Sequence, residues 1–346
     1  MSGIINAKKS SFVVFGSGFD RVRDNSGDGK KPFLYKCNYA AFDVTNRYCW
    51  IVTKSGNAED IRIRKLDTTT WEEVNHAFEN VDVHGNAHGL LTYIENDESN
   101  LGVLVTDQNK TLIFDLTTDE VFCTTNQNLY DINLRYKPRA THVGDYIRII
   151  GTTMNPSDYN ASFAVINMAD ETIIRNYQSG GYTFSGFYND TDIALANRYY
   201  GDRRYLWGAK IENNGMLTQL WGNPQAYYSS NVLIDSFSKF NDFYFPTKVG
   251  NEWKFGKYPI PPDLITPSPI TTFGENANTL ATPPVYTRGR TWASFRMTDN
   301  SLVVTDMVNM AVLYKGDSPS LTPIAMGDPW IICDGSDGYT YLARYK

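Results

Sequence analysis

The sequence contains few cysteines and histidines, and this narrows the kinds of site it can build. Its 346 residues include four cysteines, none of them in a Cys-x-x-Cys pair, and four histidines. A disulfide-rich secreted scaffold and a structural zinc site both need more cysteines at closer spacing. We therefore expect reduced thiols with a structural role and no disulfide framework.

Long apolar runs and an excess of positive charge are also missing. No segment approaches the roughly 18 consecutive apolar residues that span a bilayer, and the first eleven residues lack the apolar stretch of a signal peptide. The 38 acidic and 32 basic residues give a net charge of −6, which provides no electrostatic footprint for nucleic acid. The sequence predicts synthesis in the cytoplasm, no nucleic-acid partner and no membrane insertion.

The 3.6-residue periodicity of amphipathic helices is absent as well. Short β-branched and aromatic runs, separated by Gly, Asn, Asp and Pro, recur instead from end to end. Hydrophobic residues make up 42% and aromatic residues 14% of the sequence, which is enough for a large core. These patterns predict an all-β fold.

The runs follow a repeat of roughly 45 residues. A turn followed by an apolar strand recurs as NRYCWIVTK from Asn46, NLGVLVTD from Asn100 and GDYIRIIGT from Gly144, with later copies from positions 241, 289 and 327. A second turn, as in LIFDLTTDEVF and AVINMADETII, joins two further strands through Asp, Asn and Thr residues that favour hairpins. This repeat resembles the four-stranded blade of the β-propeller superfamily. It lacks the GH…WD signature and the paired glycines of kelch units, so no repeat family is assigned.

The resemblance implies one propeller domain over residues 1–346, with seven blades; six or eight blades are the alternatives. The predicted blades lie near residues 33–80, 86–128, 136–179, 180–225, 228–273, 280–316 and 319–346. The last unit lacks an outer strand, and an unpaired edge invites aggregation. We expect residues 11–19, SFVVFGSGF, to supply it, so that the N-terminal strand pairs with the C-terminal blade and closes the ring.

Prolines interrupt the pattern in the fifth blade. Five of them lie between Pro259 and Pro269. Proline cannot donate a hydrogen bond to a neighbouring strand and is confined to edges and loops. We expect this outer strand to be short, irregular or polyproline-like.

Two segments contain residue types that bind metals. Asp24, Ser26 and Asp28 in DNSGDG place oxygen side chains as at the start of a calcium loop, but Tyr35 stands where the bidentate acid belongs. The alternative is an acidic turn. A second segment, VDVHGNAHG, spaces two histidines four apart, but it is rich in glycine and lacks the glutamate of a zinc-binding helix. We predict no metal site and no cofactor.

Aromatic and arginine side chains gather around the fourth predicted blade. Such residues provide large, rigid contact area and are enriched at interaction hot spots. The candidates for binding a ligand or partner are Tyr199, Tyr200, Arg203, Arg204, Tyr227 and Tyr228, with the four tyrosines expected in loops. The alternative is that most of these rings pack into the blade core.

Motifs of catalysis are missing, and no catalytic residue is predicted. The sequence has no G-x-S-x-G elbow, Walker loop or Rossmann fingerprint. Our first hypothesis is a non-catalytic interaction or structural module that binds a protein or glycan through its loops. Its divergent repeats, rich in Asn, Thr, Tyr and Gly, resemble bacteriophage tail, baseplate and other virion proteins in style, which implies a virion assembly or homo-oligomer.

Two other functions are compatible with the fold. A carbohydrate-active propeller, either a glycosidase or a lyase, would bring several acids together with Tyr or Arg at the central mouth. A secreted binding protein would use the glycosylation sequons at Asn109, Asn160 and Asn189. The first hypothesis predicts a mouth without convergent ionisable groups.

Overall fold

The structure is a computed structural model of an all-β protein. It describes residues 20–21, 36–54, 62–78, 81, 91–94, 100–106, 110–126, 129, 138–151, 161–178, 182–188, 191–200, 203–222, 237–239, 242–249, 252–259, 268–275, 282, 284–307, 309, 311–317, 321–335 and 340–344. The one helix in these ranges is a 3-10 turn, Arg288–Arg290. None of the described helical structure is long and apolar enough to cross a membrane. The all-β prediction is confirmed.

The described strands pair antiparallel into seven four-stranded sheets, which we number in sequence order. The first sheet contains β2 (Lys36–Phe42), β3 (Tyr48–Lys54), β4 (Arg62–Asp67) and β5 (Glu72–Val74). The second contains β6 (Leu91–Tyr93), β7 (Leu101–Val105), β8 (Thr111–Asp115) and β9 (Val121–Thr125). The third contains β10 (Pro138–Val143), β11 (Tyr146–Gly151), β12 (Ala161–Asn167) and β13 (Thr172–Gln178).

The remaining sheets follow the same order of strands. The fourth contains β14 (Tyr182–Phe187), β15 (Ile193–Tyr200), β16 (Arg203–Ile211) and β17 (Leu217–Gly222). The fifth contains β18 (Phe237–Lys239), β19 (Asp242–Val249), β20 (Glu252–Pro259) and β21 (Ser268–Glu275). The sixth contains β22 (Val285–Tyr286), β23 (Trp292–Arg296), β24 (Ser301–Asp306) and β25 (Ala311–Asp317). The seventh contains β26 (Leu321–Met326), β27 (Trp330–Gly335), β28 (Thr340–Arg344) and β1 (Asp20–Arg21).

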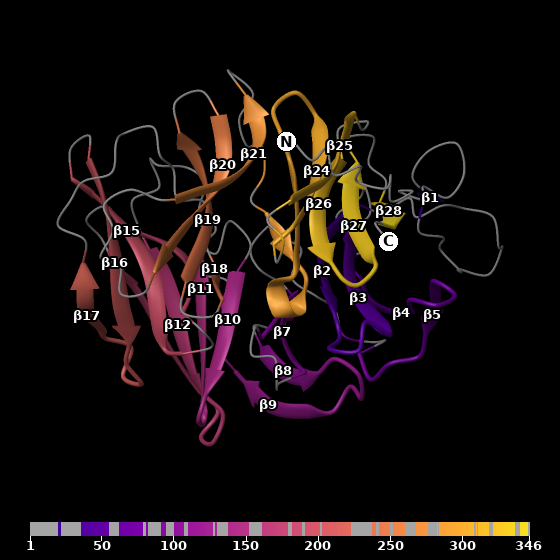
Figure 1. The fold of residues 1–346 in the computed structure, drawn as a ribbon. Coiled ribbons are helices and arrows are strands. Elements are labelled where there is room, and N and C mark those ends of the chain that lie inside the picture. Colours follow the sequence, from indigo (N-terminus) through magenta and orange to yellow (C-terminus); the bar gives the residue numbers. More distant parts are fainter. Residues whose placement is uncertain are drawn as a thin grey trace.

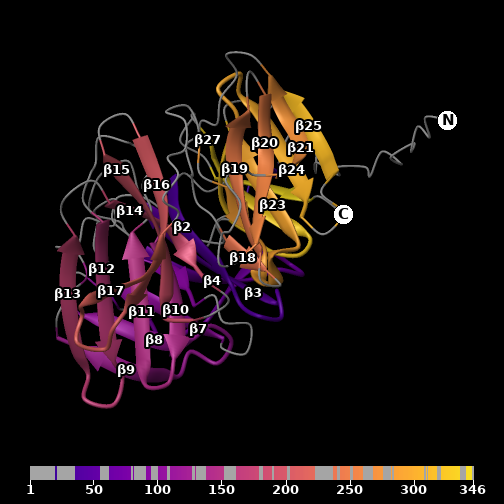
Figure 2. The ribbon, with the colours of Figure 1, turned by 60° about the vertical axis from the view of Figure 1, so that its left-hand side comes forward.

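Each sheet contacts the next one in the sequence. The first strands β2, β6, β10, β14 and β18 contact one another in that order, β21 contacts β25, and β22 contacts β26. Figure 1 shows the yellow β26–β28 beside the indigo first sheet, where β26 contacts β2. Figure 2 shows the orange fifth sheet alongside β23–β25 of the sixth. The contacts therefore run from the first sheet to the seventh and back to the first.

An N-terminal strand completes the seventh sheet. β1 pairs antiparallel with β28, with Asp20 opposite Leu342 and Arg21 opposite Tyr341. An N-terminal strand thus pairs with the C-terminal sheet, as we predicted from the lack of an outer strand in the last repeat. The segment for which the pairing was predicted, residues 11–19, lies outside the described residues.

Residues with a left-handed backbone conformation form the recurring turns. Asn46 (φ 57°) and Gly144 (φ 62°) precede second strands, and asparagine and glycine adopt this conformation at little cost. The turns between third and fourth strands place Trp71 (φ 58°), Asp119 (φ 66°) and Glu171 (φ 57°) in the same region. Tryptophan and glutamate rarely adopt it, so the hairpin and its packing impose the conformation at these positions.

The outer strand of the fifth sheet, β21, begins at the end of the proline-rich segment and pairs irregularly. β21 spans eight residues, Ser268–Glu275. Its pairing with β20 shifts register twice, between Trp253 and Lys254 and between Phe255 and Gly256. Pro269 stands opposite Gly256 on this edge strand, and edge strands are where sheets tolerate proline. Irregular pairing is one of the three forms expected for this strand, and most of the proline-rich segment lies outside the described residues.

Trp50 joins the first and second sheets. It is fully buried, and its Nε1 donates to the Leu116 carbonyl of the second sheet at 2.7 Å. The ring packs edge-on against His76 and Phe114, with centroids 5.1 and 5.2 Å away. Arg148 joins the third and fourth sheets through a similar hydrogen bond, in which its Nε donates to the Ile211 carbonyl at 2.7 Å. Both donors are the third residue of a second strand.

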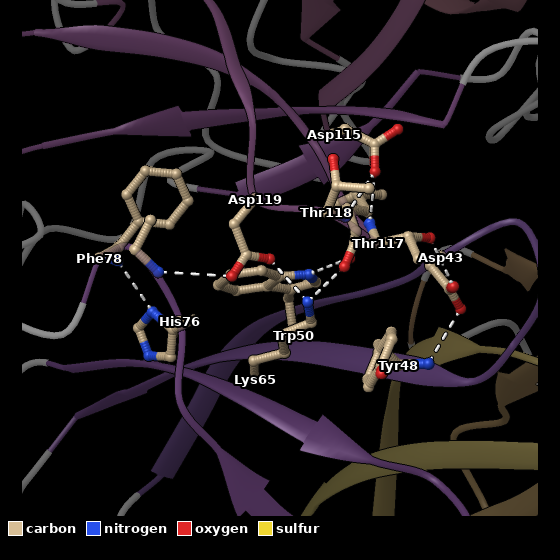
Figure 3. A network of polar contacts seen from close by, with 12 residues as sticks. Asp43, Tyr48, Trp50, Lys65, His76, Phe78, Asp115, Thr117, Thr118 and Asp119 are labelled. Atoms are coloured by element: carbon tan, nitrogen blue, oxygen red, sulfur yellow. Dashed lines mark hydrogen bonds and ion pairs between the residues drawn. The ribbon is translucent and has the colours of Figure 1, made fainter.

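Lys65 reinforces the junction at Trp50. Its Nζ donates to the Thr117 carbonyl and lies 2.6 Å from Oδ1 of Asp119. The same ammonium lies 4.2 Å from the centroid of the Tyr48 ring. Figure 3 shows it between the first sheet, which contributes Tyr48 and Trp50, and the turn that contributes Asp119. A buried cation is tolerated here because it has an anion, a carbonyl and aromatic faces around it.

Candidate functional site

A pocket lies where the first strands of several sheets meet. Its volume is about 100 Å³. The residues that line it come from β2, β6, β10, β22 and β26 and from the position just before β22: Tyr39, Ala40, Leu91, Thr92, Tyr93, Pro138, Arg139, Pro284, Val285, Tyr286, Ile324, Ala325 and Met326. The first, second, third, sixth and seventh sheets therefore share one cavity, and each contributes residues of its first strand to the wall.

Bulges in two first strands decide which side chains line this pocket. The pairing of β2 with β3 shifts register between Cys37 and Tyr39, and that of β26 with β27 shifts between Pro323 and Ala325. A bulge inserts an extra residue and re-aims the side chains next to it. The inserted residue in β26, Ile324, is itself part of the pocket wall.

Arg139 is the charged residue among those that line the pocket. It comes from β10 in the third sheet and is 7% exposed. Its guanidinium lies 5.1 Å from the centroid of the Tyr286 ring, which belongs to β22 in the sixth sheet. The guanidinium of the third sheet thus contacts the tyrosine face of the sixth sheet at the pocket. An attraction of this kind is worth about 0.5 to 2 kcal/mol, depending on how far water is excluded.

A second arginine–tyrosine pair joins the sixth sheet to Tyr93 in the pocket wall. Arg288, in the 3-10 turn after β22, lies 5.2 Å from the centroid of the Tyr93 ring in the second sheet. Its Nη1 also donates to Oδ1 of Asn100 at 3.3 Å. The same oxygen accepts from the backbone N–H of Val44, just after β2, at 2.8 Å. The sixth, second and first sheets are therefore tied together beside the pocket.

The remaining walls of the pocket are mostly apolar. Leu91, Val285 and Met326 are buried. The wall between the second and third sheets is held by Thr92, whose Oγ1 donates to the Pro138 carbonyl at 3.0 Å. The arrangement offers one cation, tyrosine rings and apolar surface. Such a site can hold a small amphipathic group and orient it through a few polar contacts.

Four of the residues predicted as a binding cluster belong to the hairpin of β15 and β16. Tyr199 and Tyr200 end strand β15, and Arg203 and Arg204 begin β16. The register places Tyr199 opposite Arg204 and Tyr200 opposite Arg203. The expectation that these two tyrosines lie in a loop is wrong, because the hairpin extends through them. The other predicted pair, at positions 227 and 228, lies outside the described residues.

The side chains of these predicted residues lie outside what the structure describes. The role of the cluster as a binding surface therefore stays a prediction. It rests on the residue types alone.

The metal candidates are not placed by the structure. Asp24, Ser26 and Asp28, and the two histidines of VDVHGNAHG, lie outside the described residues. Within the ranges that are described, no three or more His, Cys, Asp or Glu side chains are grouped so that they could hold a metal ion.

The other buried titratable groups of the described residues have structural surroundings. Cys49, Cys123 and Cys333 are buried. Burial, reinforced by nearby carboxylates, raises the pKa of Cys123 to about 11. Burial also lowers the pKa of Arg148, an effect that Asp192 opposes. A thiol with a raised pKa is a poor nucleophile, and this agrees with the structural role predicted for the cysteines.

Sequence reasoning missed Arg139, Thr92 and the tyrosines of the pocket. Arg139 and Thr92 stand on first strands, a few residues before the turn-and-strand signature that defines the repeat. An alignment of the repeats can identify these strands. It cannot reveal that side chains from sheets far apart in the sequence meet in one cavity, because that depends on the ring and on the bulges.

Comparison with known proteins supports the architecture. No family model matches the sequence, and no curated protein matches it. Among solved structures it is similar to the β-propeller domain of Cps50 (Swd1) from Myceliophteria thermophila, with 8% identity over 90% of this chain and 97% of that one and a TM-score of 0.56. The fold is a β-propeller.

A second similar structure is the computationally designed protein Ika8. It matches with 11% identity over 90% of this chain and 96% of its own, at a TM-score of 0.49. At 8% identity, the likeness to the Cps50 domain describes the fold and carries nothing about ligands. The function must therefore be argued from the site itself.

Proposed function

We propose that this propeller is a non-catalytic interaction module and that a protein partner inserts a small group into the central pocket. The observation that carries the proposal is the composition of that pocket: Arg139 held against Tyr286, with apolar walls from other sheets. Rigid aromatic and arginine side chains around a cavity are typical of interaction hot spots. The stacked sheets supply the rigid frame that such a site needs.

We also infer that the seven sheets are the seven blades of one ring that occupies residues 1–346. Support comes from the unbroken order of contacts from β2 around to β26 and from β26 back to β2. It also comes from β1, which gives the last sheet its fourth strand. The ring brings first strands from both ends of the sequence to the same pocket.

A carbohydrate-active enzyme is the alternative from another class. Glycoside hydrolysis in most families uses a pair of carboxyl groups on either side of the bond that is cleaved. The pocket-lining residues among those described include one arginine and three tyrosines but no Asp or Glu. This composition favours binding over acid–base chemistry at the pocket.

The finer parts of the hypothesis stay predictions. A place in a bacteriophage virion, binding of glycans and homo-oligomer formation rest on the style of the sequence. The candidates for a second contact surface remain Tyr199, Tyr200, Arg203 and Arg204, together with Tyr227 and Tyr228. A secreted binding protein remains the third possibility.

The proposal is tested by selecting ligands and then closing the pocket. The protein is used to select binders from a displayed library of random linear peptides. The affinities of the selected peptides are measured by calorimetry. Two substitutions, Ala40→Leu and Ile324→Phe, enlarge side chains on two walls of the pocket. Each should abolish binding of most of the selected peptides. A glycan array with a hydrolysis assay on its hits runs in parallel, and we expect no hydrolysis.

A surface variant provides the matched control. Phe122 on the outer strand β9 is 52% exposed and belongs to no part of the pocket. Phe122→Ser should leave peptide binding unchanged. If peptides bind the two pocket-filling variants as well as the wild type, or if the pocket variants alone abolish a hydrolytic activity, the proposal is wrong.

A further inference from the structure

We infer that the group held in the central pocket is an aliphatic side chain of the partner protein, of the size of leucine or methionine. The inference rests on the proposed function and specifies its chemistry. The residues that select the ligand are Leu91, Val285, Ala325 and Met326, which we call the floor of the pocket.

The floor is the buried part of the pocket lining. Its four residues are between 3% and 7% exposed. Four other residues that line the pocket are partly exposed: Tyr39, Ala40, Tyr93 and Ile324. A side chain that reaches past these residues to the floor leaves water as it binds. The chemistry of the floor therefore determines which side chains gain by binding.

The floor favours a hydrocarbon group. The side chains of Leu91, Val285 and Ala325 contain no hydrogen-bonding atom, and the thioether of Met326 is only a weak acceptor. A polar group placed against them would lose its hydrogen bonds to water without replacement from the floor, which is costly. A hydrocarbon group has no such bonds to lose and gains free energy by leaving water.

The volume of the cavity sets the size of that group. It is about 100 Å³. An engineered apolar cavity of about 150 Å³ in another protein holds a benzene molecule. The four carbon atoms of a leucine side chain, compared with the six of benzene, need about two thirds of that space, which matches this pocket. A phenylalanine or tryptophan side chain is too large for it.

The experiment compares ligands that differ in one side chain. The small probes are the N-acetyl methylamides of leucine, asparagine and phenylalanine, where asparagine is the polar counterpart of leucine and phenylalanine the larger one. Binding is measured by saturation-transfer NMR and calorimetry. In the selected peptides, the aliphatic residue on which binding depends is replaced by Ala, Asn or Phe. We expect each replacement to weaken binding about 10- to 100-fold, as for loss of one buried leucine side chain.

The protein variants locate the effect at the floor. Met326→Ala should enlarge the pocket and reverse the preference, so that the phenylalanine ligand binds more tightly than the leucine ligand. Met216→Ala is the matched control, because the same change is made in a residue that is 61% exposed and does not line the pocket. It should leave the preference for leucine unchanged.

A folding check accompanies each variant. Circular dichroism and thermal melting report whether Met326→Ala and Met216→Ala fold as the wild type does. If Met326→Ala does not fold, the comparison of the three probes on the wild-type protein still decides.

The outcomes separate this inference from the proposal beneath it. Ligands that are lost on filling the pocket but that bind equally well with asparagine in place of leucine would overturn the aliphatic side chain and leave the interaction module intact. A wild-type preference for phenylalanine, or a folded Met326→Ala variant that still prefers leucine, would overturn it as well. Ligands indifferent to filling the pocket would overturn the proposed function itself.

Discussion

The substitution Trp50→Phe tests how neighbouring sheets are held together. The change removes the Nε1 donor that lies 2.7 Å from the Leu116 carbonyl, in a residue with no exposed surface. Leaving a buried acceptor without its partner costs about 1 to 3 kcal/mol. The ring carbons lost add about 1 to 2 kcal/mol at roughly 0.8 kcal/mol per buried CH2-sized group. We expect the free energy of unfolding to fall by about 2 to 5 kcal/mol.

Trp71→Phe is the matched control for the hydrogen bond. Trp71 packs edge-on against Trp330, with ring centroids 5.2 Å apart, and its buried Nε1 has no hydrogen-bond partner among the described residues. The same chemical change there removes ring atoms only. Urea denaturation followed by far-UV circular dichroism gives both values, from the shift in midpoint at unchanged slope. Equal losses for the two variants would refute the role given to the Trp50 hydrogen bond.

Two pH-dependent effects follow from buried groups. The pKa of Cys123 is raised from 9.0 to about 11, so its contribution to stability is present below pH 9 and is lost as the pH rises towards 11. Cys123→Ala should flatten this decline in the denaturation midpoint. Iodoacetamide labelling mapped by mass spectrometry should find Cys123 unmodified in the native protein below pH 9. Rapid labelling of the native protein would contradict the raised pKa. Burial alone would raise the pKa of Asp67, but hydrogen bonds from Thr69 and Arg47 outweigh it, so the pKa is lowered from 3.8. Asp67→Asn should therefore have a lower free energy of unfolding than the wild type at neutral pH. The difference in free energy should shrink as the pH falls below 3.8 through the folded-state pKa. A difference that does not change with pH would count against this account.

Local signals in the sequence determined most of the strands and their turns. Asn46 and Gly144 precede second strands because their backbones accept positive φ at little cost. The apolar runs that follow them became β3 and β11, since β-branched residues favour a pleated, buried surface. Asp67 and Asp115 accept hydrogen bonds from the N–H groups two residues on, at Thr69 and Thr117, a local contact that favours the turn predicted there.

Tertiary structure decided where side chains from distant parts of the sequence meet. Arg139 and Tyr286 are far apart in sequence and come together only because the sheets close into a ring. The bulges of β2 and β26 then set which residues face the pocket, and nothing in the local sequence marks them. Tyr199 was expected in a loop, but pairing with Arg204 extended the hairpin through it. Strands form from local preferences, whereas a site between sheets depends on packing over the whole protein.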